Sequence, residues 1–210
     1  MQNRMGENID LEWERDPYAD RVWDALQTIK VDPEGGMAAL LDLGAQGSAL
    51  ALVYAGHRYR DGSNRVKKNE EAAHKLLRQS FDLGSMEGGY LLGHMQIANG
   101  HPKEGLDTFN QLSDMGYLPA MYAMGYEYVF GDPSIRNERK GEEAFKRAAY
   151  RGHFWAKREL ANLMLRRRTI QGFLNGWIMK FATVIPFAYL RLTYPNSDRL
   201  RGVEAEIRSA

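Results

Sequence analysis

The sequence contains no cysteine among its 210 residues. This absence excludes disulfides, thiolate metal sites, iron–sulfur clusters and cysteine nucleophiles, so we expect the fold to rest on packing alone. A strong net charge is also lacking, because 28 Lys and Arg nearly balance 27 Asp and Glu. We therefore expect no nucleic-acid partner, and an electrostatic partner would have to be recognised by a local patch.

The N-terminal residues also lack the basic flank and apolar core of a secretory signal, since they are polar and acidic. This favours a cytoplasmic protein, with a position peripheral to the inner membrane face as an alternative that depends on the C-terminal region.

Signatures of catalysis and metal binding are missing as well. No pair among the five histidines has the offset of a helical zinc site, and no phosphate-cradling Gly-x-x-x-x-Gly-Lys-Ser/Thr loop occurs. The acidic pairs Glu70-Glu71 and Glu142-Glu143 fall near the starts of expected helices, where carboxylates favour the macrodipole. We predict a non-enzyme with no catalytic residue, no metal and no cofactor, with an enzyme that has an unrecognised site as an alternative.

What the sequence does have is a period. Gly47, Gly84, Gly116 and Gly152 are spaced by 37, 32 and 36 residues. Four residues after each glycine comes a small residue, and the same holds eleven residues before it. These small residues are Ala51, Gly88, Ala120 and Ala156 on the downstream side, and Gly36, Ala73, Gly105 and Gly141 on the upstream side.

This spacing predicts a repeating pair of helices joined by a turn. Small side chains at fixed places let two helix backbones approach closely. The closing glycine of each unit suits the left-handed conformation that ends helices. Because one helix pair of this size cannot bury its apolar face alone, neighbouring pairs have to stack.

At these residues the chain resembles the Sel-like repeat family, relatives of the tetratricopeptide repeat. The best copy is AMYAMGYEYVFG at 120–131 followed by FKRAAYRG at 145–152. The first copy departs from the family pattern at Ala55, and the second replaces the usual tyrosine with Gln96. The resemblance covers residues 34–168 and implies a protein-interaction scaffold with an unidentified protein or peptide partner.

The predicted fold class is therefore all-α: an α-solenoid, a right-handed superhelix of antiparallel helix pairs, with a divergent N-terminal cap and an amphipathic C-terminal helix. Five regions follow in chain order: 1–17, a polar segment; 18–47, a divergent helix pair; 48–168, the Sel-like repeats; 169–193, an amphipathic apolar helix; and 194–210, a polar tail.

Two positions one turn apart in each first helix are not dictated by the repeat pattern, and the resemblance puts first helices on the concave side. These positions combine aromatic area with polar groups, which suits a peptide-binding groove, although packing between repeats would also explain some of the tyrosines. The predicted groove residues are Val53, His57, Tyr90, His94, Tyr122, Tyr126, Arg158 and Asn162.

The amphipathic segment 169–193 has three interpretations: a helix that caps the array, a peripheral membrane anchor, or a homodimer or partner contact. A membrane-spanning helix is disfavoured, because polar residues and Pro186 interrupt the apolar run and positive charge lies on both sides. We expect Pro186 to stop or kink the helix. The residues proposed for membrane or oligomer contact are Arg166, Arg167, Arg168, Phe173, Trp177 and Phe181.

Overall fold

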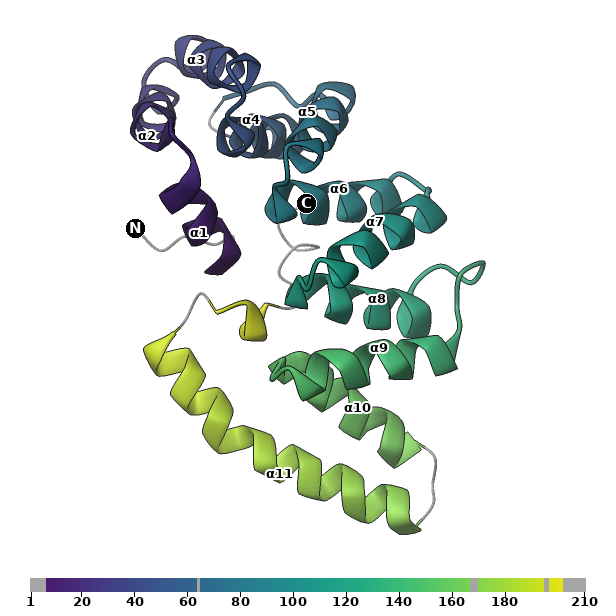
Figure 1. The fold of residues 1–210 in the computed structure, drawn as a ribbon. Helices are drawn as coiled ribbons and strands as arrows, with labels where there is room; N and C mark the ends of the chain where they lie inside the picture. Colours follow the sequence, from purple (N-terminus) through teal and green to yellow (C-terminus); the bar gives the residue numbers. More distant parts are fainter. Residues whose placement is uncertain (1–6, 64, 167–169, 195–196, 202–210) are drawn as a thin grey trace. The chain divides into compact units, whose positions relative to one another are not determined.

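The computed structural model describes residues 7–63, 65–166, 170–194 and 197–201 (Figure 1). Within these ranges all regular structure is helical and no β-strand occurs. The predicted all-α class, built from helix pairs of the α-solenoid type, is confirmed. Arg167 and Arg168, and most of the tail from residue 195 onward, lie outside the described residues.

In chain order the helices are α1 (Glu7–Arg15), α2 (Ala19–Thr28), α3 (Pro33–Ala45), α4 (Ala49–Asp61), α5 (Glu70–Asp82), α6 (Met86–Ala98), α7 (Pro102–Asp114), α8 (Leu118–Phe130), α9 (Glu138–Tyr150), α10 (Phe154–Arg166), α11 (Ile170–Thr193) and the 3-10 turn η1 (Asp198–Leu200).

These helices divide into two compact units. The N-terminal unit contains Asn8–Gly100, and the C-terminal unit begins at His101. In the first, α2 packs on α3, α3 on α4, α4 on α5 and α5 on α6. In the second, α7 packs on α8, α8 on α9, α9 on α10 and α10 on α11. The first helices of the repeats are α4, α6, α8 and α10.

The four periodic glycines end helices in the way that the spacing predicts. Gly47, Gly84, Gly116 and Gly152 have φ of +100°, +95°, +90° and +92°. The residue after each glycine donates its N–H to a carbonyl of the preceding helix. For example, the Ser48 N–H donates to the Leu43 carbonyl at 3.0 Å. This is a Schellman cap, and the left-handed backbone that it needs explains the glycine.

The glycines inside helices mark close approaches within a pair. A Cβ on Gly56 of α4 would lie 2.8 Å from Leu77 of α5. In the C-terminal unit, a Cβ on Gly125 of α8 would lie 2.4 Å from the Phe145 ring of α9. Leu77 and Phe145 are both fully buried, so each glycine opens the space that a large core side chain fills.

The regions flanking the repeats are also helical. α2 and α3 occupy the segment in which we expected a divergent pair, and Asp32 caps α3 by accepting the Gly35 N–H at 3.0 Å. The polar N-terminal segment contains α1, which the sequence patterns did not indicate. We expected Pro186 to stop or kink the helix, and it does not stop it, because α11 continues to Thr193 with the proline inside it.

Candidate binding surface

The predicted groove residues fall into two groups on the first helices. Those nearer the helix start are mostly core residues, with Val53 and Tyr90 at 0% exposure and Tyr122 at 4%. One turn later, four side chains are partly exposed at equivalent positions. We call these four the first-helix ridge: His57, His94, Tyr126 and Asn162.

In the N-terminal unit, a core aromatic ring and a carboxylate orient the ridge. The His94 ring lies edge-on to the buried Tyr90 ring, with centroids 4.5 Å apart. His57 Nδ1 lies 3.2 Å from the Asp61 carboxylate one turn later on α4. Both imidazoles are therefore held in place with part of the ring accessible.

In the C-terminal unit, the ridge is more aromatic. Tyr126 packs against Phe130, with ring centroids 5.1 Å apart, and against Tyr122 at 6.4 Å. Asn162 donates to Glu159 at 3.1 Å. Arg158 stacks over the Trp155 ring at 4.6 Å. Arg158, the last of the predicted groove residues, therefore contacts a side chain of its own helix, α10.

A second set of side chains stands at the repeat junctions. The residue directly after each periodic glycine donates its N–H to the end of the preceding helix. The same residue comes immediately before the next helix. We call these the junction residues: Ser48, Ser85, Tyr117 and His153.

Three of the junction residues cap the following helix with a side-chain acceptor. Ser48 Oγ accepts the Ala51 N–H at 3.0 Å, and Ser85 Oγ accepts the Gly88 N–H at 2.9 Å. His153 Nδ1 does the same for the Ala156 N–H at 3.2 Å. A serine after a glycine is an N-cap signal that could have been recognised from the sequence, whereas a capping histidine is rarely anticipated.

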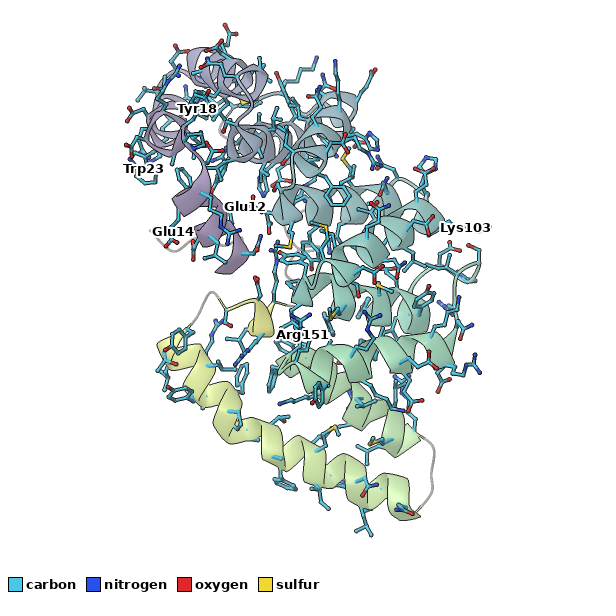
Figure 2. The ribbon with its side chains drawn as sticks, viewed as in Figure 1. Glu12, Glu14, Tyr18, Trp23, Lys103 and Arg151 are labelled. Carbon is cyan, nitrogen blue, oxygen red and sulfur yellow. The ribbon has the colours of Figure 1, made fainter. Side chains whose placement is uncertain are left out.

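The junction residues of the N-terminal unit contact α1 and the turn that follows it. Figure 2 labels Glu12, the α1 residue that makes the first of these contacts. Ser85 Oγ donates to Glu12 Oε2 at 2.7 Å, and the Glu87 N–H donates to Glu12 Oε1 at 3.2 Å. Ser48 Oγ donates to Asp16 Oδ2 at 2.8 Å. Burial raises the pKa of the Glu12 carboxyl to about 7, and the nearby Glu87 charge adds to the rise.

In the C-terminal unit, the segment 197–201 covers the corresponding residues. His153 is fully buried, and its Nε2 lies 2.9 Å from the Arg201 carbonyl oxygen. The Trp155 indole N–H donates to the Leu200 carbonyl at 2.6 Å, and the Arg201 guanidinium donates to the Tyr117 hydroxyl at 2.8 Å. Burial lowers the pKa of His153 to about 3, which favours the neutral ring. Because Nδ1 accepts the Ala156 N–H and Nε2 faces the Arg201 carbonyl, the hydrogen bonds assign the proton to Nε2.

The long helix α11 presents an apolar face to solvent. One side of it packs on α10, where a Cβ on Gly176 would lie 2.7 Å from Leu165. The other side exposes Trp177 by 43%, although Phe187 of the same helix stacks on Phe154 of α10 at 4.2 Å. The large exposed apolar residues of α11 are Phe173, Leu174, Trp177, Ile178, Phe181, Val184, Tyr189 and Leu192.

By length and composition, Gln171–Thr193 is the one stretch among the described residues that could cross a membrane. Little of its most apolar window is buried. The predicted contact residues Phe173, Trp177 and Phe181 all lie on the exposed side, and Arg166 at the end of α10 is exposed and stacks over Phe130 at 5.5 Å.

Chemistry of other kinds has little support in the described parts of the chain. No group of three or more His, Asp or Glu side chains there could hold a metal ion. Glu127 on α8 is buried, and burial raises the pKa of its carboxyl to about 7. Because desolvation accounts for this rise, the shift does not indicate a coupled acid and base of the kind that proton transfer needs.

The comparison with family models follows this geometry. The model named Sel1 repeat matches residues 49–85 and 118–153, which are α4 with α5 and α8 with α9. The chain contains two Sel1 repeats. Both matches include the junction glycine and the junction residue that ends each pair, and this agrees with the resemblance inferred from the residue pattern. Sel1 repeats are in general non-catalytic scaffolds that bind proteins.

Two solved structures share the Sel1-repeat fold. The first is c5321, a protective antigen of uropathogenic Escherichia coli with an SLR fold, at a TM-score of 0.63 and 16% identity over 79% of this chain. The second is a Sel1 repeat protein from Oxalobacter formigenes, at a TM-score of 0.55 and 18% identity over 70% of this chain. No curated protein matches the sequence.

These structural relatives are longer than the chain. The alignment spans 38% of the E. coli protein and 64% of the O. formigenes protein. At these identities the likeness concerns the fold, so partners have to be inferred from the chain's own surface.

Proposed function

We propose that the chain is a non-catalytic scaffold that binds a protein or peptide partner along its first helices. The observation that carries this proposal is the first-helix ridge, in which His57, His94, Tyr126 and Asn162 are partly exposed at the same repeat position. Sel1 repeats in general serve protein interaction, which supports the same conclusion.

The chemistry of the ridge suits peptide recognition. Rings and amides offer apolar area together with a hydrogen-bonding group, which is the composition that dominates binding energy at interfaces. The ridge side chains stand on helices and are already oriented by neighbours such as Tyr90 and Phe130, so little side-chain entropy would be lost on binding.

The test is to replace the four ridge residues together by alanine and to identify the proteins that the tagged chain retains from its native lysate. We expect the partners to be lost. A matched control replaces the exposed second-helix residues Glu71, Asp107 and Glu143 by alanine and should retain them. Unchanged partners on a ridge variant with wild-type circular dichroism would refute the proposal.

We also propose a second function for α11, which is peripheral attachment to the inner face of a membrane by a chain that otherwise resides in the cytoplasm. The exposed apolar face of α11 supports it, with Phe181 at 69% and Phe173 at 56% exposure. No acidic residue occurs between Glu159 and Asp198, whereas several Arg and Lys do. An apolar face flanked only by positive charge suits an anionic lipid surface.

The packing of α11 favours a helix lying in the membrane plane over one that crosses it. A cavity of about 600 Å³ between α11 and the α9–α10 pair is lined by Lys146, Lys157 and Asn175 among others. A spanning α11 would draw these lysines into hydrocarbon, which costs several kcal/mol per charge. In the membrane plane, the same polar groups stay on the water side.

Vesicle co-sedimentation tests this attachment. The full chain should bind anionic vesicles more than neutral ones, with binding weakened by salt. Replacing Phe173, Trp177 and Phe181 by aspartate should abolish binding, whereas the same change at Leu83 and Met115, exposed residues directly after α5 and α7, should not. Equal binding by the α11 variant would refute the proposal, and a dimer that the α11 variant alone loses would assign the face to a second copy.

A further inference from the structure

The helix α1 is attached to the N-terminal unit in an unusual way. It packs closely against no other described helix. Polar side chains make its contacts instead, together with Ile9, which is fully buried, and Trp13, whose indole N–H donates to the Tyr54 hydroxyl at 2.9 Å. The Trp13 and Tyr54 rings are also in contact, with centroids 5.6 Å apart.

The two carboxylates of this segment each bind the start of a first helix. Glu12 accepts from Ser85 Oγ and the Glu87 N–H at the start of α6. Asp16 Oδ2 accepts from Ser48 Oγ at 2.8 Å and from the Leu50 N–H at 3.2 Å at the start of α4. Each carboxylate accepts hydrogen bonds from a serine hydroxyl and from a backbone N–H in the first turn of a helix. A bound acidic ligand would make the same contacts.

The covered surface is therefore complementary to a short pattern: a glutamate, an aromatic ring directly after it, and an aspartate one helical turn further on. Trp13 fills the position between the carboxylates and uses Tyr54 on α4. The outer side of α1 remains open, with Leu11 at 42% exposure and Glu14 and Arg15 exposed. The segment thus resembles a peptide laid on the repeats more than an additional repeat helix.

From these contacts we infer that Ser48, Tyr54 and Ser85 form a peptide-binding site that α1 occupies in cis. The site takes an acidic helical segment with an aromatic ring beside its first carboxylate, and a partner that carries such a segment binds by displacing α1. The inference rests on the proposed scaffold function, because it names the chemistry of one partner and the way in which the chain controls access to it.

The same surroundings disfavour an inorganic or phosphorylated anion. Glu87 is fully buried on α6 next to the position of the Glu12 carboxylate, and its charge contributes to raising the Glu12 pKa. A doubly charged phosphate would meet this repulsion in full, whereas a carboxyl group can bind a proton and reduce it. Because burial raises the pKa of Glu12 to about 7, docking becomes less favourable as the pH rises through 7, and α1 becomes easier to displace.

The experiment uses the full chain and a fluorescent, end-capped peptide with the sequence of residues 7–18, ENIDLEWERDPY. A variant with Glu12→Lys, Trp13→Ala and Asp16→Lys undocks α1 and leaves the repeat surface intact. If α1 is docked in nine of ten molecules, the peptide should bind this variant about tenfold more tightly than wild type. Binding is measured by fluorescence anisotropy.

The matched control carries Glu14→Lys and Arg15→Glu on the open side of α1 and should bind like wild type. Adding Ser85→Ala and Tyr54→Phe to the undocked variant should remove the binding gained. A peptide with the three α1 replacements should not bind any of the proteins. Should the triple variant lose its helical circular dichroism, Trp13→Phe, which removes the indole N–H but keeps an aromatic ring, should still raise peptide binding.

Equal peptide binding by wild type and undocked variant, or none by either, would overturn the inference and make α1 a permanent part of the fold. The proposed scaffold function fails by a different result, namely unchanged partners on the ridge variant. Peptide failure with partners lost on the ridge variant would therefore remove only the control by α1.

Discussion

The two units of this chain cover their junction residues by opposite chemistry. In the N-terminal unit, carboxylates of Glu12 and Asp16 accept hydrogen bonds from serine caps. In the C-terminal unit, backbone carbonyls of the segment 197–201 face a neutral histidine, and Arg201 donates to Tyr117. The repeat fixes the backbone at each junction through a left-handed glycine, but it leaves the next side chain free to vary, so the junctions can acquire different functions.

The two units also differ in how the pKa of the buried group at their junctions is shifted. Burial favours the neutral form of both Glu12 and His153, which raises the pKa of the acid to about 7 and lowers that of the base to about 3. Because the neutral glutamic acid has bound a proton and the neutral histidine has lost one, the two covers should respond to pH in opposite directions.

The largest expected effect is that of removing the histidine. His153→Ala deletes the cap of α10, the contact with Arg201 O and the stacking on Tyr122 at 4.6 Å. We expect a loss of about 3 kcal/mol from the C-terminal unit. Urea unfolding followed by hydrogen exchange of α8 and α10 measures it. The exposed His101→Ala is the control, and equal losses for both would show that the junction adds no stability.

Acid should weaken the same unit without mutation. The folded-state pKa of His153 lies below its ordinary value of 6.5, so the stability it confers is present above about pH 6.5 and is lost as the pH falls toward 3. At about pH 4 the loss should be about 3 kcal/mol, from 1.4 kcal/mol per pH unit. Hydrogen exchange of the segment 197–201 across this range measures it. His153→Gln should flatten the profile, and an unchanged slope in that variant would assign the acid sensitivity to other groups.

The cover of the N-terminal unit should behave the other way. Since the folded pKa of Glu12 is raised, its contribution is full below about pH 4.5 and is lost as the pH rises through about 7. The groups facing it are Asn8 on α1, Ser85 at the N-cap of α6 and Glu87 on α6. Between about pH 4 and pH 7.5 the docking of α1 should weaken by about 2 to 3 kcal/mol.

Hydrogen exchange of α1 measures this weakening, because amide protection of the helix reports its docking. Glu12→Gln mimics the protonated acid and should keep α1 protected at high pH. If α1 of that variant became exposed at the same pH as wild type, Glu12 would not be the responsible group.

The repeats could be predicted from the sequence because their constraints recur. Gly47, Gly84, Gly116 and Gly152 occupy a backbone conformation that few other residues adopt, so their period shows the helix ends directly. Gly56 and Gly125 mark the close approaches for a similar reason. The left-handed backbone at helix ends and the close approach of paired helices are both local properties that recur from repeat to repeat.

The contacts of α1 and of the segment 197–201 with the junction residues could not be predicted. They join segments far apart in the chain, and each occurs only once. Glu12 meets Ser85 across 73 positions, and His153 meets Arg201 across 48. The sequence analysis did not single out His153, although it follows Gly152 as Ser48 follows Gly47. The groove prediction also could not separate exposure from packing, since Tyr90 is fully buried and His94, one turn later, is not.

The smallest expected effect comes from Ser48. Ser48→Ala removes the acceptor for the Ala51 N–H and the donor to Asp16, but Asp16 keeps the Leu50 N–H. We expect a loss of about 1 kcal/mol, the usual value for an N-cap serine. Hydrogen exchange should increase at the start of α4 and in α1, while α8 and α10 stay as in wild type. Ser48→Asp restores the cap but places a second carboxylate against Asp16, so it should protect α4 and still release α1. If Ser48→Asp instead protected both α4 and α1, the Ser48 hydroxyl would act only as a cap. The Asp16 carboxylate would then bind the start of α4 without that hydroxyl.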